Sequence, residues 1–191
     1  MTETDNKKKI AIFTSIAVAL VVLDQITKNI IVKKFELYQQ KDIIKGFFSL
    51  YYTRNTGSAF SFLADKAWGI YVLTAISFIM SIALYIVLLR AIKLKDMITS
   101  FAFTLFIAGA VGNLIDRALY KSVVDFIRFD FGSYTFPIFN VADICAVCAT
   151  GLLIGLLIFG KGRIEVLMDS FDKKKNDQAQ ADVTEEVTDG V

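Results

Sequence analysis

The chain has 191 residues, of which 55% are hydrophobic and 21% are charged, and its formal net charge is +2. It contains no histidine and only two cysteines, which excludes mechanisms that need an imidazole, four-cysteine zinc sites and disulfide-rich scaffolds. The small net charge, without a long basic stripe, also argues against nucleic-acid binding.

Four apolar stretches predict four membrane-spanning helices. A helix needs about 20 mostly apolar residues to cross about 30 Å of hydrocarbon. Backbone polar groups in lipid must be satisfied within the element, so these stretches are expected to be helices and not strands. We expect the helices at about residues 10–31, 68–89, 97–118 and 140–160. The predicted fold class is an all-α integral membrane protein.

Basic residues flank the predicted helices mainly on one side of the membrane. Lys and Arg are enriched in cytoplasmic loops, so both chain ends are expected in the cytoplasm. The segment 1–9 would lie there, as would the polar, partly acidic segment 161–191, which is expected to be a disordered tail. The basic residues concerned are Lys7, Lys8, Lys9, Arg90, Lys93, Lys95, Lys161 and Arg163.

A signal peptide is an alternative interpretation of the first apolar stretch. The stretch follows a basic start and contains the triplet Ala17-Val18-Ala19, which is similar to a cleavage site. Cleavage there would leave three crossings and would remove the N-terminal lysines.

Two loops on the opposite, outer side are long enough to hold structure of their own. The first, residues 32–67, contains the aromatic, β-favouring run FFSLYYT at 47–53, bounded by Gly46 and an Asn-Thr-Gly turn. The second, residues 119–139, contains VVDFIRFDF, whose aromatic side chains suit the headgroup boundary. We therefore expect a short pair of strands on the membrane surface in the first loop.

Polar residues gather at the outer ends of the predicted helices. An ionisable group inside a membrane is costly unless it is paired or reaches water, so it marks a candidate functional site. Asp24 and Lys28 lie four residues apart on one helix face, in the order that favours an ion pair. They could form an interfacial ion pair or could position a substrate. The other members of this set are Asn113, Asp116, Arg117, Asp125, Asn140 and Asp143.

Asp125 and Asp143 are a candidate catalytic pair. Taken singly, Asp125 could be a solvated loop acid, and Asp143 could favour the positive end of a helix dipole. If the two carboxylates face each other in a site of low polarity, the pair holds one proton near neutral pH. Aspartic proteases use this arrangement: one carboxylate activates water while the protonated one polarises the scissile carbonyl. The sequence does not assign which aspartate is the base.

Two other functions would use different residues. Cys145 and Cys148 form a C-x-x-C pair in an apolar helix, where small apolar filling is the ordinary role of cysteine. A membrane thiol oxidoreductase would use them as a redox pair. A non-enzymatic transporter or adaptor would use Asp24 and Lys28 for ion coupling, although the charges gather at one face of the membrane and do not line a path across it.

Five short motifs occur in order along the chain. They are D-Q-I-T-K at 24–28, R-N-T-G-S-A-F at 54–60, G-N-L-I-D-R at 112–117, V-V-D-F at 123–126 and F-N-V-A-D at 139–143. Their order, spacing and placement against four crossings resemble bacterial lipoprotein signal peptidase, also called signal peptidase II, over about residues 10–160. One such motif would be weak, but five in order are specific.

The resemblance implies a four-helix aspartyl endopeptidase of the bacterial inner membrane with both termini in the cytoplasm. Such an enzyme removes signal peptides from prolipoproteins by cutting before a diacylglyceryl-modified cysteine near the outer face. The resemblance also implies a small extracytoplasmic β-cradle, a short interfacial helix and inhibition by the cyclic peptide globomycin. No cofactor or metal is implied. The expected partners are prolipoproteins and membrane lipids, with no nucleic acid, and nothing requires more than a monomer.

The resemblance further implies roles for particular residues. Asp125 and Asp143 match the two catalytic carboxylates of the family. Asp116 matches a motif position and is expected to be structural. The supporting and substrate-binding positions of the family match Asp24, Lys28, Asn55, Gly57, Asn113, Arg117 and Asn140.

Overall fold

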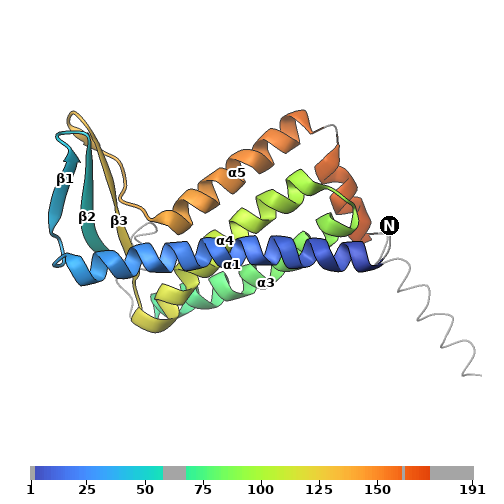
Figure 1. The fold of residues 1–191 in the computed structure, drawn as a ribbon, viewed down its shortest axis with the longest axis horizontal. Coiled ribbons are helices and arrows are strands. Elements are labelled where there is room, and N and C mark those ends of the chain that lie inside the picture. The colour runs from blue at the N-terminus through green and yellow to red at the C-terminus, as the bar shows by residue number, and fades with distance from the viewer. Residues whose placement is uncertain (1–2, 58–67, 161, 173–191) are drawn as a thin grey trace, which may run out of the picture.

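The computed structural model describes residues 3–57, 68–160 and 162–172. Long helices and a small sheet make up most of these ranges (Figure 1). The helices are α1 (Glu3–Lys34), α3 (Gly69–Lys93), α4 (Met97–Tyr120) and α5 (Val141–Phe159). The strands are β1 (Gln40–Ile44), β2 (Phe48–Asn55), β3 (Val123–Phe131) and β4 (Tyr134–Thr135).

All four of these helices are long and apolar enough to cross a membrane. Large apolar side chains point outward from them, among them Ile79 on α3 and Val147 on α5, which are 63% and 70% exposed. Apolar faces of this extent are stable against lipid and unfavourable in water. The predicted fold class, an all-α membrane protein with four spans and a small sheet, is confirmed. The short interfacial helix expected after the sheet lies outside the described residues.

Helix α4 is central, because it contacts α1, α3 and α5. Apolar side chains from α1, α3 and α4 form a buried cluster between them. The buried members of this cluster are Phe13, Ala17, Leu84, Leu88, Ile92 and Ile107. Lipid is as apolar as these side chains, so tight packing rather than exclusion of water stabilises such contacts.

Two glycines allow α4 to approach its neighbours closely. A Cβ at Gly109 would lie 2.6 Å from the carbonyl oxygen of Ala142. A Cβ at Gly112 would lie 2.8 Å from Asp24 Oδ2 and 2.9 Å from the Cβ of Ala142. Small residues permit the close backbone approach that helix packing in membranes uses. As a result, α1, α4 and α5 meet at the height of Asp24.

The strands form one antiparallel sheet in the order β1-β2-β3-β4. The sheet stands at the end of the helix bundle that is opposite the N-terminus (Figure 1). Tyr52, Val124 and Phe126 pack against Ile31 near the end of α1, and this contact attaches the sheet to the bundle. The β-favouring run at 47–53 lies mainly in β2, as expected. The second outer loop adds β3, which the sequence analysis did not predict as a strand.

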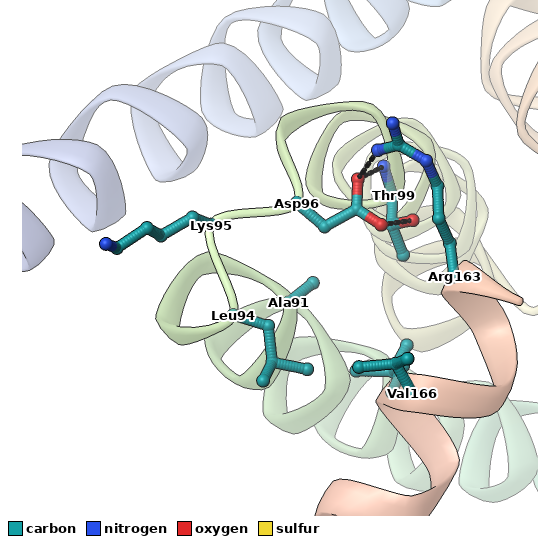
Figure 2. Close-up of a pocket in the computed structure, with 8 residues that line it drawn as sticks. Ala91, Leu94, Lys95, Asp96, Thr99, Arg163 and Val166 are labelled. Atoms are coloured by element: carbon teal, nitrogen blue, oxygen red, sulfur yellow. Dashed lines mark hydrogen bonds and ion pairs between the residues drawn. The ribbon is translucent and has the colours of Figure 1, made fainter. Parts of the chain in front are cut away.

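Part of the C-terminal segment differs from the predicted disordered tail, because residues 163–172 form a helix. Leu167 of this helix is buried. Arg163 Nη1 lies 3.0 Å from Oδ1 of Asp96, the N-cap residue of α4 (Figure 2). The buried leucine and the ion pair are contacts that dock this helix on the rest of the protein. Because the segment 161–191 is polar as a whole, its composition did not indicate the helix at 163–172.

The helix at 163–172 sits at the turn between α3 and α4, on the same end of the bundle as the N-terminus (Figure 1). Arg90 of α3 donates hydrogen bonds to Ser170. A cavity of about 220 Å³ lies beneath the helix and includes Thr99 and Leu94 in its lining (Figure 2). This cavity is at the opposite end of α4 from the polar motif residues, so it is separate from the predicted site.

Candidate active site

Asp125 lies on β3, opposite Thr53 of β2, and is only 3% exposed. Its Oδ1 accepts a hydrogen bond of 2.7 Å from Asn140 Nδ2, and its Oδ2 accepts one of 3.1 Å from Asn55 Nδ2. Burial, and after it the negative charge of Asp143, raises the pKa of Asp125 to about 7, although the two amide hydrogen bonds act in the opposite direction. A carboxyl group of this kind exchanges its proton near neutral pH.

Asp143 lies in the first turn of α5 and is half-buried. It forms a capping box with Asn140: Asn140 Oδ1 accepts from Asp143 N at 2.9 Å, and Asp143 Oδ2 accepts from Asn140 N at 3.1 Å. Asp143 Oδ1 also accepts a hydrogen bond of 2.8 Å from Asn113 Nδ2 on α4. The carboxylate is therefore fixed from two helices and lies at the positive end of α5.

Asn140 connects the two aspartates. It is fully buried. Its side-chain amide donates to Asp125, and its backbone N–H donates to Asp143. Asn140 Nδ2 also lies 3.0 Å from Asn113 Oδ1 and 3.3 Å from the carbonyl oxygen of Val124. The strand that holds one aspartate and the helix that holds the other thus share one polar centre.

Asp24 and Lys28 form the predicted ion pair, with 2.8 Å between Lys28 Nζ and Asp24 Oδ2. Both side chains are almost completely buried, at 1% and 3% exposed. Lys28 Nζ also lies 3.1 Å from Asp116 Oδ2 and donates a hydrogen bond of 3.0 Å to Asn113 Oδ1. The pair lies inside the bundle next to Asn113.

Gly57 has a left-handed backbone conformation, with φ of +109°, which glycine adopts without strain. Its N–H donates to Asn55 Oδ1 at 2.9 Å, so the turn orients the amide that reaches Asp125. A Cβ at Gly57 would also lie 2.7 Å from Leu73 Cδ1. A larger residue would therefore be strained at this φ and would require the Leu73 side chain to shift.

Arg117 of α4 is half-buried beside the two aspartates. Its positive charge interacts more strongly with the carboxylate of Asp143 than with that of Asp125. Its Nη1 lies 3.5 Å from Ser77 Oγ, while its buried Nε has no hydrogen-bond partner within the described part of the chain. The guanidinium supplies positive charge to the site and, among the described residues, forms no hydrogen bond to either carboxylate.

An apolar groove with a volume of about 300 Å³ adjoins Asp143. Apart from the aspartate, its lining is apolar or weakly polar: Phe136, Phe139, Ile144, Val147 and Cys148. Val147 is exposed on the lipid-facing side of α5. A hydrophobic group could therefore reach Asp143 from the side of the bundle.

Gln25 is a polar residue of the site that the sequence analysis did not single out. Its Nε2 lies 3.0 Å from Asp116 Oδ1, 3.1 Å from the carbonyl oxygen of Gly112 and 3.2 Å from Asp24 Oδ2. An amide beside an aspartate in an otherwise apolar helix was the available signal. Asp116, for which only a structural role was expected, is 1% exposed and belongs to the same network.

The residues that the alternative functions would use do not form separate sites in the part of the chain that the structure describes. Cys145 is buried, Cys148 is exposed and both are free thiols. Asp24 and Lys28 are tied to the polar network near the sheet. Within the described ranges, no group of three or more His, Cys, Asp or Glu side chains could hold a metal ion.

Comparison with known proteins identifies the family. Residues 16–159 match the family described as signal peptidase (SPase) II. The chain belongs to this family. A curated lipoprotein signal peptidase from Haemophilus ducreyi is 39% identical over 85% of this chain and 93% of its own length. The protein of the same name from Listeria monocytogenes is 42% identical over 74% of this chain and 88% of its own length.

Solved structures show the same fold. Two structures described as bacterial membrane enzymes match the chain with TM-scores of 0.65 and 0.67. They are 34% and 33% identical in sequence, and each match covers 78% of this chain and 88% or 94% of the other. As a member of the signal peptidase II family, the protein is a multi-pass membrane peptidase that removes signal peptides from prolipoproteins. Neither the oxidoreductase nor the transporter interpretation is supported.

Proposed function

We propose that Asp125 and Asp143 are the catalytic pair of an aspartic endopeptidase that cleaves prolipoproteins before the diacylglyceryl-modified cysteine. The observation that supports this proposal best is the double hydrogen bonding by Asn140. Its side chain binds Asp125 at 2.7 Å, and its backbone N–H binds Asp143 at 3.1 Å. One buried residue therefore holds two carboxylates from different elements in a common site.

The two aspartates have different environments, which supports different roles. Asp125 is buried and its pKa is raised to about 7, so this carboxyl group is the better candidate for the shared proton. Asp143 is half-buried, and its carboxylate accepts hydrogen bonds from Asn113 Nδ2 and from Asn140 N. We assign Asp143 as the base and Asp125 as the acid, with the pair titrating as a unit.

The reaction then proceeds in two balanced steps. Asp143 takes a proton from water as the water oxygen attacks the scissile carbonyl carbon, and Asp125 gives its proton to the carbonyl oxygen. The tetrahedral intermediate collapses when the carbon–nitrogen bond breaks. Asp143 then protonates the leaving amine, while Asp125 recovers a proton from the intermediate's hydroxyl group. Both carboxyl groups return to their starting states.

The groove beside Asp143 is the proposed path for the apolar part of the substrate. The scissile bond directly precedes the lipid-modified cysteine, so acyl chains start only a few atoms from the reacting carbonyl. An apolar groove that begins at Asp143 and opens along Val147 fits a group that arrives from the bilayer. Asn113 and Arg117 would orient Asp143 and stabilise its charge, and Asn55 would orient Asp125.

The proposed orientation places both chain ends in the cytoplasm and the sheet at the outer face of the inner membrane. The N-terminus and the helix at 163–172 share one end of the bundle, and the sheet lies at the other end (Figure 1). Lys7, Arg90 and Lys93 lie toward the first end, as the enrichment of basic residues in cytoplasmic loops requires. The proposal includes a monomeric enzyme in contact with membrane lipids, and inhibition by globomycin.

Cleavage of defined precursors tests this function. The purified full-length protein, reconstituted in lipid, is incubated with one prolipoprotein in its diacylglyceryl-modified and unmodified forms. We expect cleavage of the modified form only. We also expect Asp125→Asn and Asp143→Asn each to lower the rate by at least about 100-fold, which is the lower range for loss of an acid or base.

Asp130→Asn is the matched control, because Asp130 lies on the same strand as Asp125 but is only half-buried, near the other end of the strand, and paired with Arg128. This variant should cleave at the rate of the unsubstituted protein. Equal cleavage of both precursor forms would contradict the proposed substrate. Normal cleavage by a folded Asp125→Asn or Asp143→Asn variant would contradict the proposed chemistry.

A further inference from the structure

A buried charged cluster, formed by Asp24, Lys28 and Asp116, lies within the bundle beside the proposed catalytic pair. Lys28 Nζ is 2.8 Å from Asp24 Oδ2 and 3.1 Å from Asp116 Oδ2. None of the three side chains is more than 3% exposed. Two carboxylates and one ammonium group remain this deeply buried only when further hydrogen bonds satisfy them. The partners that supply these bonds show what the cluster holds in place.

Each carboxylate of the cluster accepts a hydrogen bond from the backbone N–H of a distant element. Asp24 Oδ1 accepts from Ala142 N on α5 at 2.9 Å. Asp116 Oδ2 accepts from Val124 N on β3 at 3.0 Å. Hydrogen bonds to an ionised carboxylate are about twice as strong as bonds between neutral groups. The cluster therefore fixes one backbone position on α5 and one on β3.

These two backbone positions have the same relation to the proposed catalytic residues. Ala142 directly precedes Asp143, and Val124 directly precedes Asp125. Lys28 then joins the two carboxylates that hold these positions. The backbone on which each catalytic side chain is mounted is thus connected to the other through a single buried ammonium group.

Two further contacts make this connection stiffer. Gln25 Nε2 lies within hydrogen-bond distance of Asp24 Oδ2 and Asp116 Oδ1, so it links the same two carboxylates a second time. Lys28 Nζ donates to Asn113 Oδ1, and Asn113 Nδ2 donates to the carboxylate of Asp143. Buried and fully connected polar networks of this kind rigidify the elements that they join.

We propose that the Asp24–Lys28–Asp116 cluster sets the position of Asp125 relative to Asp143, and that Asp116 is a positioning residue of the reaction. The inference rests on the proposed function of the two aspartates. Catalytic groups must be held within about 0.5 Å of their productive geometry, and here they lie on two separate elements, the strand β3 and the helix α5. Asp116 touches neither catalytic carboxylate and acts through the backbone of Val124.

Substitution of Asp116 tests the inference. Asp116→Leu removes the acceptor for Val124 N–H and one link to Lys28, and keeps the branched shape of the side chain. We expect kcat to fall on the order of 100-fold, the loss typical of a displacement of about 1 Å. KM for the lipidated precursor should change by less than about two-fold, because substrate binding does not use this residue. Asp116→Asn keeps an acceptor oxygen, so its kcat should be about ten-fold higher than that of Asp116→Leu.

Thr104→Val is the matched control. Thr104 is completely buried on the same helix, and its Oγ1 donates to the Ser100 carbonyl oxygen, outside the cluster. This variant should retain the kcat of the unsubstituted protein. Rates are compared per folded protein, measured as the monodisperse fraction in size-exclusion chromatography, so that reduced yield does not count as reduced catalysis.

The outcomes separate this inference from the proposed function. Unchanged kcat in folded Asp116→Leu overturns the positioning role, as does a loss that appears only in KM. If Asp116→Leu does not fold, Asp116→Asn decides, and unchanged kcat in that variant overturns the role. If Asp125→Asn is inactive while Asp116→Leu is fully active, only the positioning role fails. If Asp125→Asn stays active, the proposed catalytic pair fails as well.

Discussion

Asn140 donates a hydrogen bond of 2.7 Å from its side-chain amide to Asp125 Oδ1. The same residue is the N-cap of α5, where its side-chain oxygen accepts from Asp143 N. The side-chain oxygen of Asn140 therefore caps α5, while its side-chain amide group binds the carboxyl group of Asp125 on β3. The helix cap contributes to stability and the bond to Asp125 contributes to catalysis, so the two effects of Asn140 can be measured separately.

Asn140→Ala should lower both the cleavage rate and the melting temperature. We expect the rate to fall on the order of 10- to 100-fold, because Asp125 loses the side-chain donor that joins it to the start of α5. We expect a loss of about 1 kcal/mol in stability from the missing helix cap. Asp96→Ala is the control, because Asp96 caps α4 at the distant end of the bundle. This variant should lose stability but keep its rate per folded protein; an equal loss of rate in both would refute a special role for Asn140.

The cleavage rate should depend on pH through Asp125. Burial and the charge of Asp143 raise the pKa of Asp125 to about 7, so its carboxyl group is protonated below that pH and ionised above it. An acid that must donate a proton is lost as pH rises, and kcat/KM should therefore decline above about pH 7. A pH profile between 5 and 9, taken as roughly two units on either side of this pKa, provides the measurement.

Asn55→Ala provides a second measurement on the same group. The hydrogen bond from Asn55 lowers the pKa of Asp125, so its removal should raise that pKa and shift the decline in kcat/KM to higher pH. Asp130→Asn should leave the decline where it is, since Asp130 is bound to Arg128 near the other end of β3 from Asp125. A shift to lower pH in Asn55→Ala would contradict the assignment of the proton to Asp125.

Gly112→Ala should disrupt the contact among three helices. The added Cβ would lie 2.8 Å from Asp24 Oδ2 and 2.9 Å from the Cβ of Ala142, so α4 must move away from α1 and α5. We expect a loss of about 1–3 kcal/mol in stability, as for other overpacked sites, together with a lower cleavage rate. Gly155→Ala on α5 is the control, because its Cβ would meet nothing within 4 Å. Thermal unfolding and cleavage assays of both variants distinguish close packing from a general intolerance of alanine.

Leu167→Ala should reduce stability without changing the chemistry. Leu167 is 3% exposed in the helix at 163–172, and truncation of a buried leucine costs about 2–5 kcal/mol where the site cannot collapse. The helix packs at the end of the bundle far from Asp125 (Figure 1), so kcat per folded protein should not change. Met168→Ala, at a 61% exposed position of the same helix, should affect neither quantity. A lower kcat in folded Leu167→Ala would show that this end of the bundle does influence the site.

The four apolar helices could be predicted from local pattern, because each needs only length and hydrophobicity to satisfy its backbone in lipid. The candidate residues could be predicted as well, because five ordered motifs and the absence of histidine left carboxylates as the catalytic groups. The pairing of Asp24 with Lys28 was visible as well, because residues four apart share a helix face. These inferences depend on short-range pattern or on resemblance.

The way in which these residues contact one another could not be predicted from the sequence. Asn140 binds Asp125 across 15 positions of sequence, and Asp24 reaches Ala142 across 118, and no local pattern encodes such distances. The docking of residues 163–172 depends on a slot between α3 and α4 that composition does not reveal. The role of Asp116 also emerges only here, because a buried carboxylate is defined by the backbone N–H groups and the ammonium group that surround it. Contacts of this kind arise from packing. The motifs therefore indicated the candidate residues, but the partners that these residues bind could be seen only in the folded structure.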